Sequence, residues 1–194
     1  LAETDGDIQA AIEIIRKKGQ AVAAKREDRQ AAEGCVLSET KEGFAAIVAL
    51  KCETDFVAKT DAFKSLVKDI AMHIAAANPS YLRREEVPAA ELEHEKMVLS
   101  EQARNEGKPE KIIEKMVTGR IEKYYKEVCL LEQDFFKDPG KTIKQYQTEV
   151  TAKVGEKVAI RRFVRYEMGE GIEKRKDDYL GEISENLAKM QQNG

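Results

Sequence analysis

The sequence has no excess of basic residues and no long apolar run. Among its 194 residues, 33 Lys and Arg stand against 36 Asp and Glu, which gives a formal net charge of −3. A general nucleic-acid binder normally carries a basic excess on at least one face, so this class of function is disfavoured. The longest apolar run, Phe44 to Leu50, is far shorter than the roughly 20 residues of a membrane-spanning helix. We therefore expect no direct contact with nucleic acid or with a membrane.

Cysteine and histidine are too sparse to indicate a metal site. The three cysteines are widely spaced and odd in number, so neither a disulfide framework nor a zinc motif is predicted, and a reducing compartment is expected. The only histidines, His73 and His94, fall on different predicted helices and cannot form a pair one helical turn apart. A metal- or thiol-dependent enzyme that uses Cys52 and His73 is one alternative, but we expect no metal, no cofactor and no active site.

The first 33 residues divide into a helix and a linker. Asp7 is a suitable N-cap, apolar residues follow at helical spacing, and Gly19 suits the position after the last helical residue. This stripe needs neighbours, which we expect upstream of Leu1. The absence of a Met and of a secretory leader at Leu1 indicates a fragment or a processed product. Residues 20–33 are Ala-rich and charged, which predicts an exposed linker, helical at most in part.

A β-hairpin is predicted from residues 35–40 and 44–52, joined by a turn at 41–43. Both alternating sets of side chains in its second strand are apolar, whereas an antiparallel sheet usually exposes one polar face. We therefore expect each face of this strand to be covered. A third strand is predicted over residues 158–167 because Val, Ile, Phe and Tyr alternate there with charged residues.

Helices fill most of the remaining chain. Apolar residues recur at helical spacing from Phe63 to Ile74, after a capping position at Thr54 or Asp55. Two further helices, separated at Gly107–Pro109, should pair as an antiparallel hairpin over residues 88–128. The inner face of the first of these helices is predicted to include Leu92, Leu99 and Ala103, and the apolar positions of the second include Ile112, Met116 and Tyr124.

Residues 131–140 predict a loop with two adjacent aromatic residues, followed by a helix that Gly155 closes. The tail over residues 172–194 predicts a last amphipathic helix. The fold class is therefore α+β, a small antiparallel sheet of about three strands with helices on it and a protruding helical hairpin. Gly140-Lys141-Thr142 is similar to the end of a phosphate-binding loop, but Phe135 replaces the first glycine of that motif. A turn before a helix is favoured.

The residues Cys-Glu-Thr-Asp-Phe-Val-Ala-Lys at positions 52–59 closely resemble a motif of the elongation factor Ts family. The resemblance continues through Ile70-Ala-Met-His-Ile-Ala-Ala, Gly107-Lys-Pro, Glu114-Lys-Met-Val-Thr-Gly-Arg and Gly169-Glu-Gly-Ile-Glu-Lys. It is collinear from about residue 5 to the end of the chain. Composition alone favours a core role for Phe56 and a capping role for Asp55, whereas the resemblance favours binding of a partner.

The resemblance also implies a domain organisation. Members of the family carry an N-terminal ubiquitin-associated-like domain of three helices before an α+β core. By this comparison, residues 1–19 are the end of that small domain, 20–33 a linker, 34–171 the core, and 172–194 a C-terminal helix. One of the two core halves of longer members is missing, as in short members that pair as homodimers through the sheet. We expect a homodimer here.

The function that the resemblance implies is guanine-nucleotide exchange on elongation factor Tu, in its GDP-bound and nucleotide-free forms. Thr54, Asp55, Phe56 and Val57 match the motif that acts on the nucleotide domain of that partner. In the family, the Phe is inserted between partner side chains and the site loses its hold on Mg²⁺. The expected compartment is a bacterial cytoplasm, or a plastid or mitochondrial matrix.

Three further residues are expected at the partner interface from the same resemblance. His73 matches a contact position, although a simple helix-face role is the alternative. Phe136 and Lys137 occupy the loop that meets the third domain of the partner, where the family more often has an aliphatic residue followed by Met. A structural or tethering module of the translation machinery, without exchange activity, is the alternative function.

Overall fold

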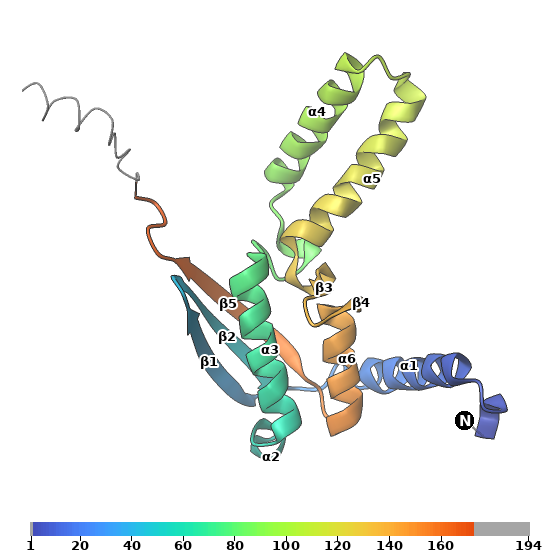
Figure 1. Cartoon of the computed structure of the whole chain (residues 1–194), viewed down its shortest axis with the longest axis vertical. Coiled ribbons are helices and arrows are strands. Elements are labelled where there is room, and N and C mark those ends of the chain that lie inside the picture. Colours follow the sequence, from blue (N-terminus) through green and yellow to red (C-terminus); the bar gives the residue numbers. More distant parts are fainter. Residues whose placement is uncertain (1, 173–194) are drawn as a thin grey trace, which may run out of the picture.

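The α+β class predicted from the sequence is confirmed. The computed structural model describes residues 2–172, and the helix predicted over residues 172–194 therefore lies outside the described part except for its first residue. The elements, in chain order, are the 3₁₀-helix η1 Ala2–Thr4, α1 Ile8–Ala24, β1 Glu33–Lys41, β2 Phe44–Cys52, α2 Asp55–Ala58, α3 Asp61–Ala77, η2 Arg84–Glu86, α4 Ala89–Asn105, α5 Glu110–Val128, η3 Leu130–Glu132, β3 Asp134–Phe135, β4 Asp138–Thr142, α6 Ile143–Val154 and β5 Ala159–Glu167 (Figure 1).

The main sheet is antiparallel, with the strand order β1-β2-β5. The predicted hairpin of β1 and β2 is confirmed, and Glu42 and Gly43 form its turn with φ of 43° and 91°. Two positive φ angles are typical of the tight turns whose twist matches the flanking strands. The predicted third strand is β5, which pairs with β2 with a register shift between Ala49 and Leu50. β2 is therefore the central strand.

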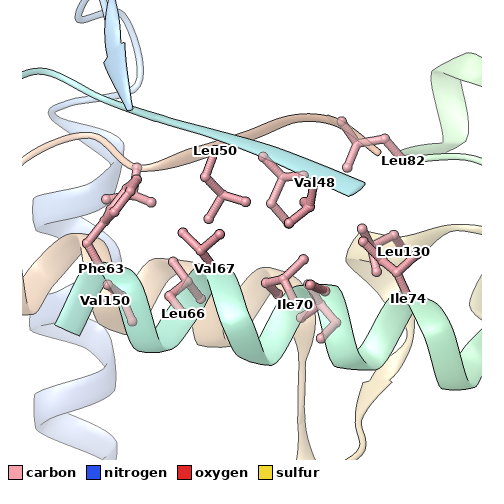
Figure 2. Packing of buried hydrophobic residues seen from close by; sticks show 14 of the residues in the cluster. Val48, Leu50, Phe63, Leu66, Val67, Ile70, Ile74, Leu82, Leu130 and Val150 are labelled. Carbon is pink, nitrogen blue, oxygen red and sulfur yellow. The ribbon is translucent and has the colours of Figure 1, made fainter. Parts of the chain in front are cut away.

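The main core lies between one face of this sheet and α3. Val48 and Leu50 point from β2 toward Phe63, Val67 and Ile70 of α3 (Figure 2), and each of these side chains is at most 1 % exposed. The helix begins where Thr60 Oγ1 accepts the Phe63 N–H and ends at Asn78, whose φ is 48°. Leu82, Leu130 and Val150 close the core from other elements.

The opposite face of the sheet is apolar and exposed. Val36 is 70 % exposed, Ile47 39 %, Val164 43 % and Tyr166 56 %. Ile47 pairs directly with Val164, so these side chains form one patch across the three strands. None of the elements between residues 2 and 172 covers this face (Figure 1). The expectation that each face of β2 is covered is therefore met only on the side of α3, and the second face is exposed among the described residues.

The predicted hairpin of two antiparallel helices is also confirmed, and α4 and α5 project away from the sheet (Figure 1). The buried residues between the two helices are Leu99, Ala103, Ile113 and Ile121. Of the apolar residues in the first turn of α5, Ile113 is buried and Ile112 is 47 % exposed. Successive helical residues are about 100° apart, so Ile112 and Ile113 cannot both face α4.

The base of this hairpin is fixed by Arg84 in η2. Its guanidinium donates to the carboxylates of Glu122 in α5 and Glu132 in η3, and it lies 4.5 Å from the centre of the Tyr125 ring. An Arg that pairs with carboxylates through parallel N–H bonds fixes orientation as well as distance. The direction in which the hairpin projects is therefore set where it joins the core.

The first helix is longer than predicted. α1 continues through Gly19 to Ala24, so the prediction that the helix ends before Gly19 is wrong, and the predicted linker over residues 20–33 begins as helix. Ala21, Ala23 and Ala24 have the highest helix propensity and outweigh one glycine. A Cβ at Gly19 would lie 3.4 Å from the Cβ of Ala152 in α6. Gly19 therefore serves the close packing of α1 on α6.

The predicted loop over residues 131–140 is wrong as well, because it contains β3 and most of β4, which form a second two-stranded sheet. Strands of two and five residues are too short to show a period in the sequence. Thr142 caps α6 with a capping box, and Lys141 Nζ is paired with Glu149 at 2.7 Å and Asp138 at 3.3 Å. The turn expected at Gly140-Lys141-Thr142 is therefore wrong, because these residues are the end of β4, whereas the helix expected after them is α6. Between residues 2 and 172, no helix is both long and apolar enough to cross a membrane.

Candidate partner-binding site

The turn between β2 and α3 presents an aromatic side chain to solvent. α2 is a single helical turn, and Thr54 is its N-cap, with Thr54 Oγ1 accepting the Val57 N–H at 3.4 Å. Val57 is buried in the main core, whereas the Phe56 side chain is 79 % exposed. A core role for Phe56 is therefore excluded in this structure. Exposure of a large aromatic residue on a rigid element is typical of a binding anchor.

Asp55, beside Phe56, carries a stable negative charge. Its Oδ2 accepts from the Lys59 ammonium at 2.6 Å, one helical turn along the chain. This hydrogen bond from Lys59 lowers the pKa of Asp55 below its ordinary value. The carboxylate is half exposed and keeps acceptor positions open to solvent. Asp55 and Phe56 together define what we call the Phe56 patch.

Every polar group of Thr54 has a partner. Its N–H donates to Glu156 Oε2 at 3.0 Å, and its hydroxyl donates to Glu156 Oε1 at 2.7 Å. Its carbonyl oxygen accepts from the Cys52 thiol at 3.1 Å and from the Ala58 N–H at 3.3 Å. Sequence reasoning missed Glu156, since no local pattern links residues that lie 102 positions apart.

Cys52 is buried and lies at the end of the central strand. Burial, followed by the negative charge of Glu156, raises the pKa of its thiol to about 11. The thiolate is the reactive form of cysteine, so this thiol is unreactive near neutral pH. Within residues 2–172, no group of three His, Cys, Asp or Glu is arranged to hold a metal ion. What this turn presents to solvent is the exposed surface of Asp55 and Phe56.

His73, Phe136 and Lys137 come together at the other end of α3. Asp61 and His73 are twelve residues apart, or about 18 Å along the helix axis. The His73 ring lies 6.0 Å from the Phe136 ring, centre to centre, and Lys137 Nζ lies 5.6 Å from the centre of the Phe136 ring. Phe136 is 45 % exposed. Phe136 and Lys137 define the Phe136 patch, with His73 beneath it.

Neighbouring side chains hold the Phe136 patch in place. Lys137 Nζ donates to Asp69 Oδ1 at 2.6 Å, and the Tyr146 hydroxyl donates to Asp69 Oδ2 at 2.9 Å. The Tyr146 ring stacks on Phe135 at 4.6 Å. The predicted residues in this loop are therefore anchored to α3 and α6. Asp69 and Tyr146 were not predicted, because their role depends on contacts between three elements.

His73 is buried, with 2 % of its surface exposed. Its Nε2 lies 3.0 Å from Gln133 Oε1, and Gln133 Nε2 donates to the Glu127 carbonyl at 2.7 Å. Because this second bond leaves the Gln133 oxygen facing His73, Nε2 is the ring nitrogen that carries the proton. Nδ1 is buried and has no hydrogen-bond partner among the described residues. His94 is an exposed residue of α4, as expected of a solvated helix position.

Burial of His73 predicts a pH-dependent stability. Burial lowers the pKa of His73, and the bond to Gln133 offsets only part of this effect. As pH falls below about 6.5, the unfolded chain takes up a proton at His73 that the folded chain resists, so the free energy of unfolding decreases. The loss has an upper limit of about 1.4 kcal/mol at pH 5.5.

Urea unfolding at pH 7.5 and 5.5 measures this effect. In a His73→Gln variant, the difference between the two pH values should be smaller than in the wild type. His94→Gln is the matched control and should leave the difference unchanged. If His73→Gln and the wild type lose equal stability between these pH values, the assignment to His73 is wrong.

The fold and the site together define a class of protein, an α+β binding protein that presents aromatic side chains from fixed turns. A family model described as "Elongation factor TS" matches residues 64–170. Curated relatives named elongation factor Ts are 59 % identical over 189 residues in Desulforamulus reducens and 56 % over 191 residues in Heliobacterium modesticaldum. These alignments cover 96 % and 97 % of this chain and 87 % and 89 % of the relatives. The chain belongs to the elongation factor Ts family, and so to protein biosynthesis at the elongation step of translation.

Proposed function

We propose that this protein is a guanine-nucleotide exchange factor for elongation factor Tu. The observation that carries the proposal is the Phe56 patch, an exposed aromatic side chain beside a carboxylate on a turn whose N-cap, Thr54, is held by hydrogen bonds to Glu156. Asp55 and Phe56 belong to the segment from Thr54 to Val57. This segment matches the family motif that acts on the nucleotide domain of the partner. Val57 anchors the turn in the core, and Phe56 is the part free to enter a partner.

The proposed mechanism is mechanical and electrostatic. Phe56 inserts between side chains of the partner near its bound Mg²⁺, while Asp55 contacts polar groups of the same domain. Mg²⁺ requires near-ideal octahedral geometry, so a small displacement of its ligands costs much of its binding energy. Loss of the ion weakens the hold on the nucleotide phosphates. No covalent bond forms, and the protein is an exchange factor with no active site of its own.

Exchange in this mechanism is a negative coupling between two ligands of one GTPase. The factor weakens nucleotide binding, and the nucleotide weakens factor binding by the same ratio. Incoming GTP can therefore displace the factor and complete the cycle. The Phe136 patch would add a second contact, with another domain of the partner. Because His73 is buried, its part in that contact would be to support Phe136 from beneath.

We also propose that the protein is a homodimer through the exposed face of the main sheet. Val36, Ile47, Val164 and Tyr166 form an apolar patch on three neighbouring strands. Two such sheets packed face to face would bury both patches in one sandwich. A two-fold axis brings the same surface of each copy together, so no second type of partner is needed.

A tethering role is the second candidate. The α4–α5 hairpin projects from the core and exposes Met97 and Ile112, at 55 % and 47 %. Such a surface could dock a larger assembly without any exchange. The compartment that we propose is the bacterial cytoplasm, since the relatives cited above are bacterial.

Release of a fluorescent GDP analogue from elongation factor Tu distinguishes the two functions. At fixed Mg²⁺, we expect a catalytic amount of this protein to increase the release rate by at least about fivefold, because a coupling of 1–3 kcal/mol changes affinity by about 5- to 150-fold and most such changes lie in the dissociation rate. Tight binding without faster release would favour tethering. The absence of both binding and faster release would contradict both roles.

A further inference from the structure

Two carboxylates, Glu53 and Glu156, link the turn of the Phe56 patch to the connection between α6 and β5. Glu156 follows Gly155 in the connection between α6 and β5, and it accepts both the N–H and the hydroxyl of Thr54, at 3.0 and 2.7 Å. In the reverse direction, Glu53 Oε1 accepts the Lys157 N–H at 2.7 Å. We propose that Glu53 and Glu156 are positioning residues for Phe56. This inference rests on the proposed function and names the residues that prepare its site.

The two hydrogen bonds that join these turns, from Lys157 to Glu53 and from Thr54 to Glu156, support each other. Each carboxylate receives a backbone N–H from the residue next to the other carboxylate, so the two turns can move only together. Hydrogen bonds to an ionised acceptor are shorter and about twice as strong as neutral ones. The Glu53 side chain is only 14 % exposed, so its bonds are largely shielded from water.

The charge of Glu53 is balanced by the segment that follows α1. Arg26 and Arg29 each place a guanidinium nitrogen on its carboxylate, at 3.3 and 3.0 Å. The bond from the Lys157 N–H, with support from both arginines, lowers the pKa of Glu53. Lys157 Nζ donates to the Glu27 carbonyl in the same segment. The predicted linker is therefore tied to the turn that carries Phe56.

The turn depends on this support because it has little of its own. A helix of four residues is far too short to be stable alone. Phe56 itself adds little packing, since its side chain is 79 % exposed, and Val57 is the only residue of α2 in the buried core. If the hydrogen bonds of Thr54 at the start of α2 were lost, the Phe56 side chain could adopt many orientations while the sheet stayed folded. Each such orientation lowers the fraction of the protein that is ready to bind.

The test uses Glu156→Gln in the full chain, with the GDP-release assay and a thermal melt. The neutral amide keeps one acceptor oxygen, and its NH₂ group can only donate, so it cannot accept the N–H and the hydroxyl of Thr54 on two oxygens. We therefore expect the second-order rate constant of release to fall about tenfold. The melting temperature should change no more than in Glu122→Gln. That matched control loses a bidentate pair with Arg84 at 2.9 and 2.7 Å, at the base of the hairpin, and should release GDP at the wild-type rate.

A double variant separates positioning from general stability. If Glu156 acts through Phe56, adding Glu156→Gln to Phe56→Ala should change release less than twofold, because the side chain to be positioned is gone. A tenfold loss in both backgrounds would overturn the proposal, and so would a wild-type rate for Glu156→Gln. Failure of the wild-type chain to accelerate release would instead contradict the proposed function.

Thr54 provides a second route if Glu156→Gln does not fold. Thr54→Ser keeps the hydroxyl that donates to Glu156 and is the reference for Thr54→Val. Thr54→Val removes that hydroxyl but keeps the shape of the side chain and the N–H bond to Glu156. The variant also loses the N-cap bond from the Val57 N–H, so we expect release to be at least about threefold slower than in Thr54→Ser, consistent with the loss of one or two hydrogen bonds. Equal rates of GDP release for Thr54→Val and Thr54→Ser would overturn the proposal.

Discussion

Replacing Phe56 by Ala is expected to lower the rate constant of GDP release from elongation factor Tu by about 30- to 1000-fold. The range corresponds to the loss of about 2–4 kcal/mol from a buried aromatic anchor at the centre of an interface. The reason is that Phe56 is 79 % exposed on a fixed turn, so its ring is available to a partner before binding. Stopped-flow release of a fluorescent GDP analogue measures the effect.

Two controls make this result specific. The melting temperature of the Phe56→Ala variant should stay close to that of the wild type, because an exposed ring contributes little to the core. Met97→Ala removes another exposed apolar side chain, 55 % exposed on α4 and outside the proposed site, and should leave release unchanged. If the Phe56→Ala variant released GDP at the wild-type rate, the Phe56 patch would not carry the activity.

Introducing a carboxylate at Ile47 is expected to separate the homodimer into monomers. Ile47 lies on the central strand and pairs with Val164, in the middle of the exposed apolar patch. In a two-fold dimer, Ile47→Asp places two carboxylates in one interface, and each unsatisfied group costs about 1–3 kcal/mol or more. The dissociation constant should therefore rise at least about 30-fold.

Light scattering coupled to gel filtration measures the mass of both forms. The wild type should have twice the chain mass of 21.8 kDa, and Ile47→Asp should have the chain mass itself. Ile112→Asp, at an exposed position of similar degree on α5, should remain dimeric. A dimeric Ile47→Asp variant would place the interface elsewhere, and a monomeric wild type would contradict the dimer itself.

The elements that the sequence predicted well have strong local patterns. The apolar spacing from Phe63 to Ile74 predicts α3, which ends at Ala77. The β1–β2 hairpin follows from two β-rich runs around Gly43. These signals depend on residues within one or two turns of each other, so no knowledge of the tertiary structure is needed.

The errors occurred where contacts between distant residues decide the outcome. Gly19 suggests a helix end, but Ala152 packs against it and the alanines that follow extend α1. The short strands β3 and β4 form only because they pair with each other. Apolar spacing alone also does not say which of the adjacent Ile112 and Ile113 faces the neighbouring helix, and in the structure it is Ile113 that is buried.

The candidate site divides in the same way. The motif from Thr54 to Val57 was identified from the resemblance, and the structure adds the exposure of Phe56 and the burial of His73. Neither Glu156 nor Gln133 could be found from the sequence. Each acts on a residue at least 60 positions away, and single carboxylates and amides occur throughout a chain in which 36 % of the residues are charged.

The α4–α5 hairpin has apolar contacts of its own, since Leu99, Ala103, Ile113 and Ile121 lie outside the main core. A segment with local contacts can open and close as a separate cooperative unit, with its own protection against amide hydrogen exchange. Insertions or deletions of whole helical turns at its tip would leave both the sheet and the turn of Phe56 unchanged. The hairpin is thus the part of the molecule in which evolution can vary length at little cost to folding.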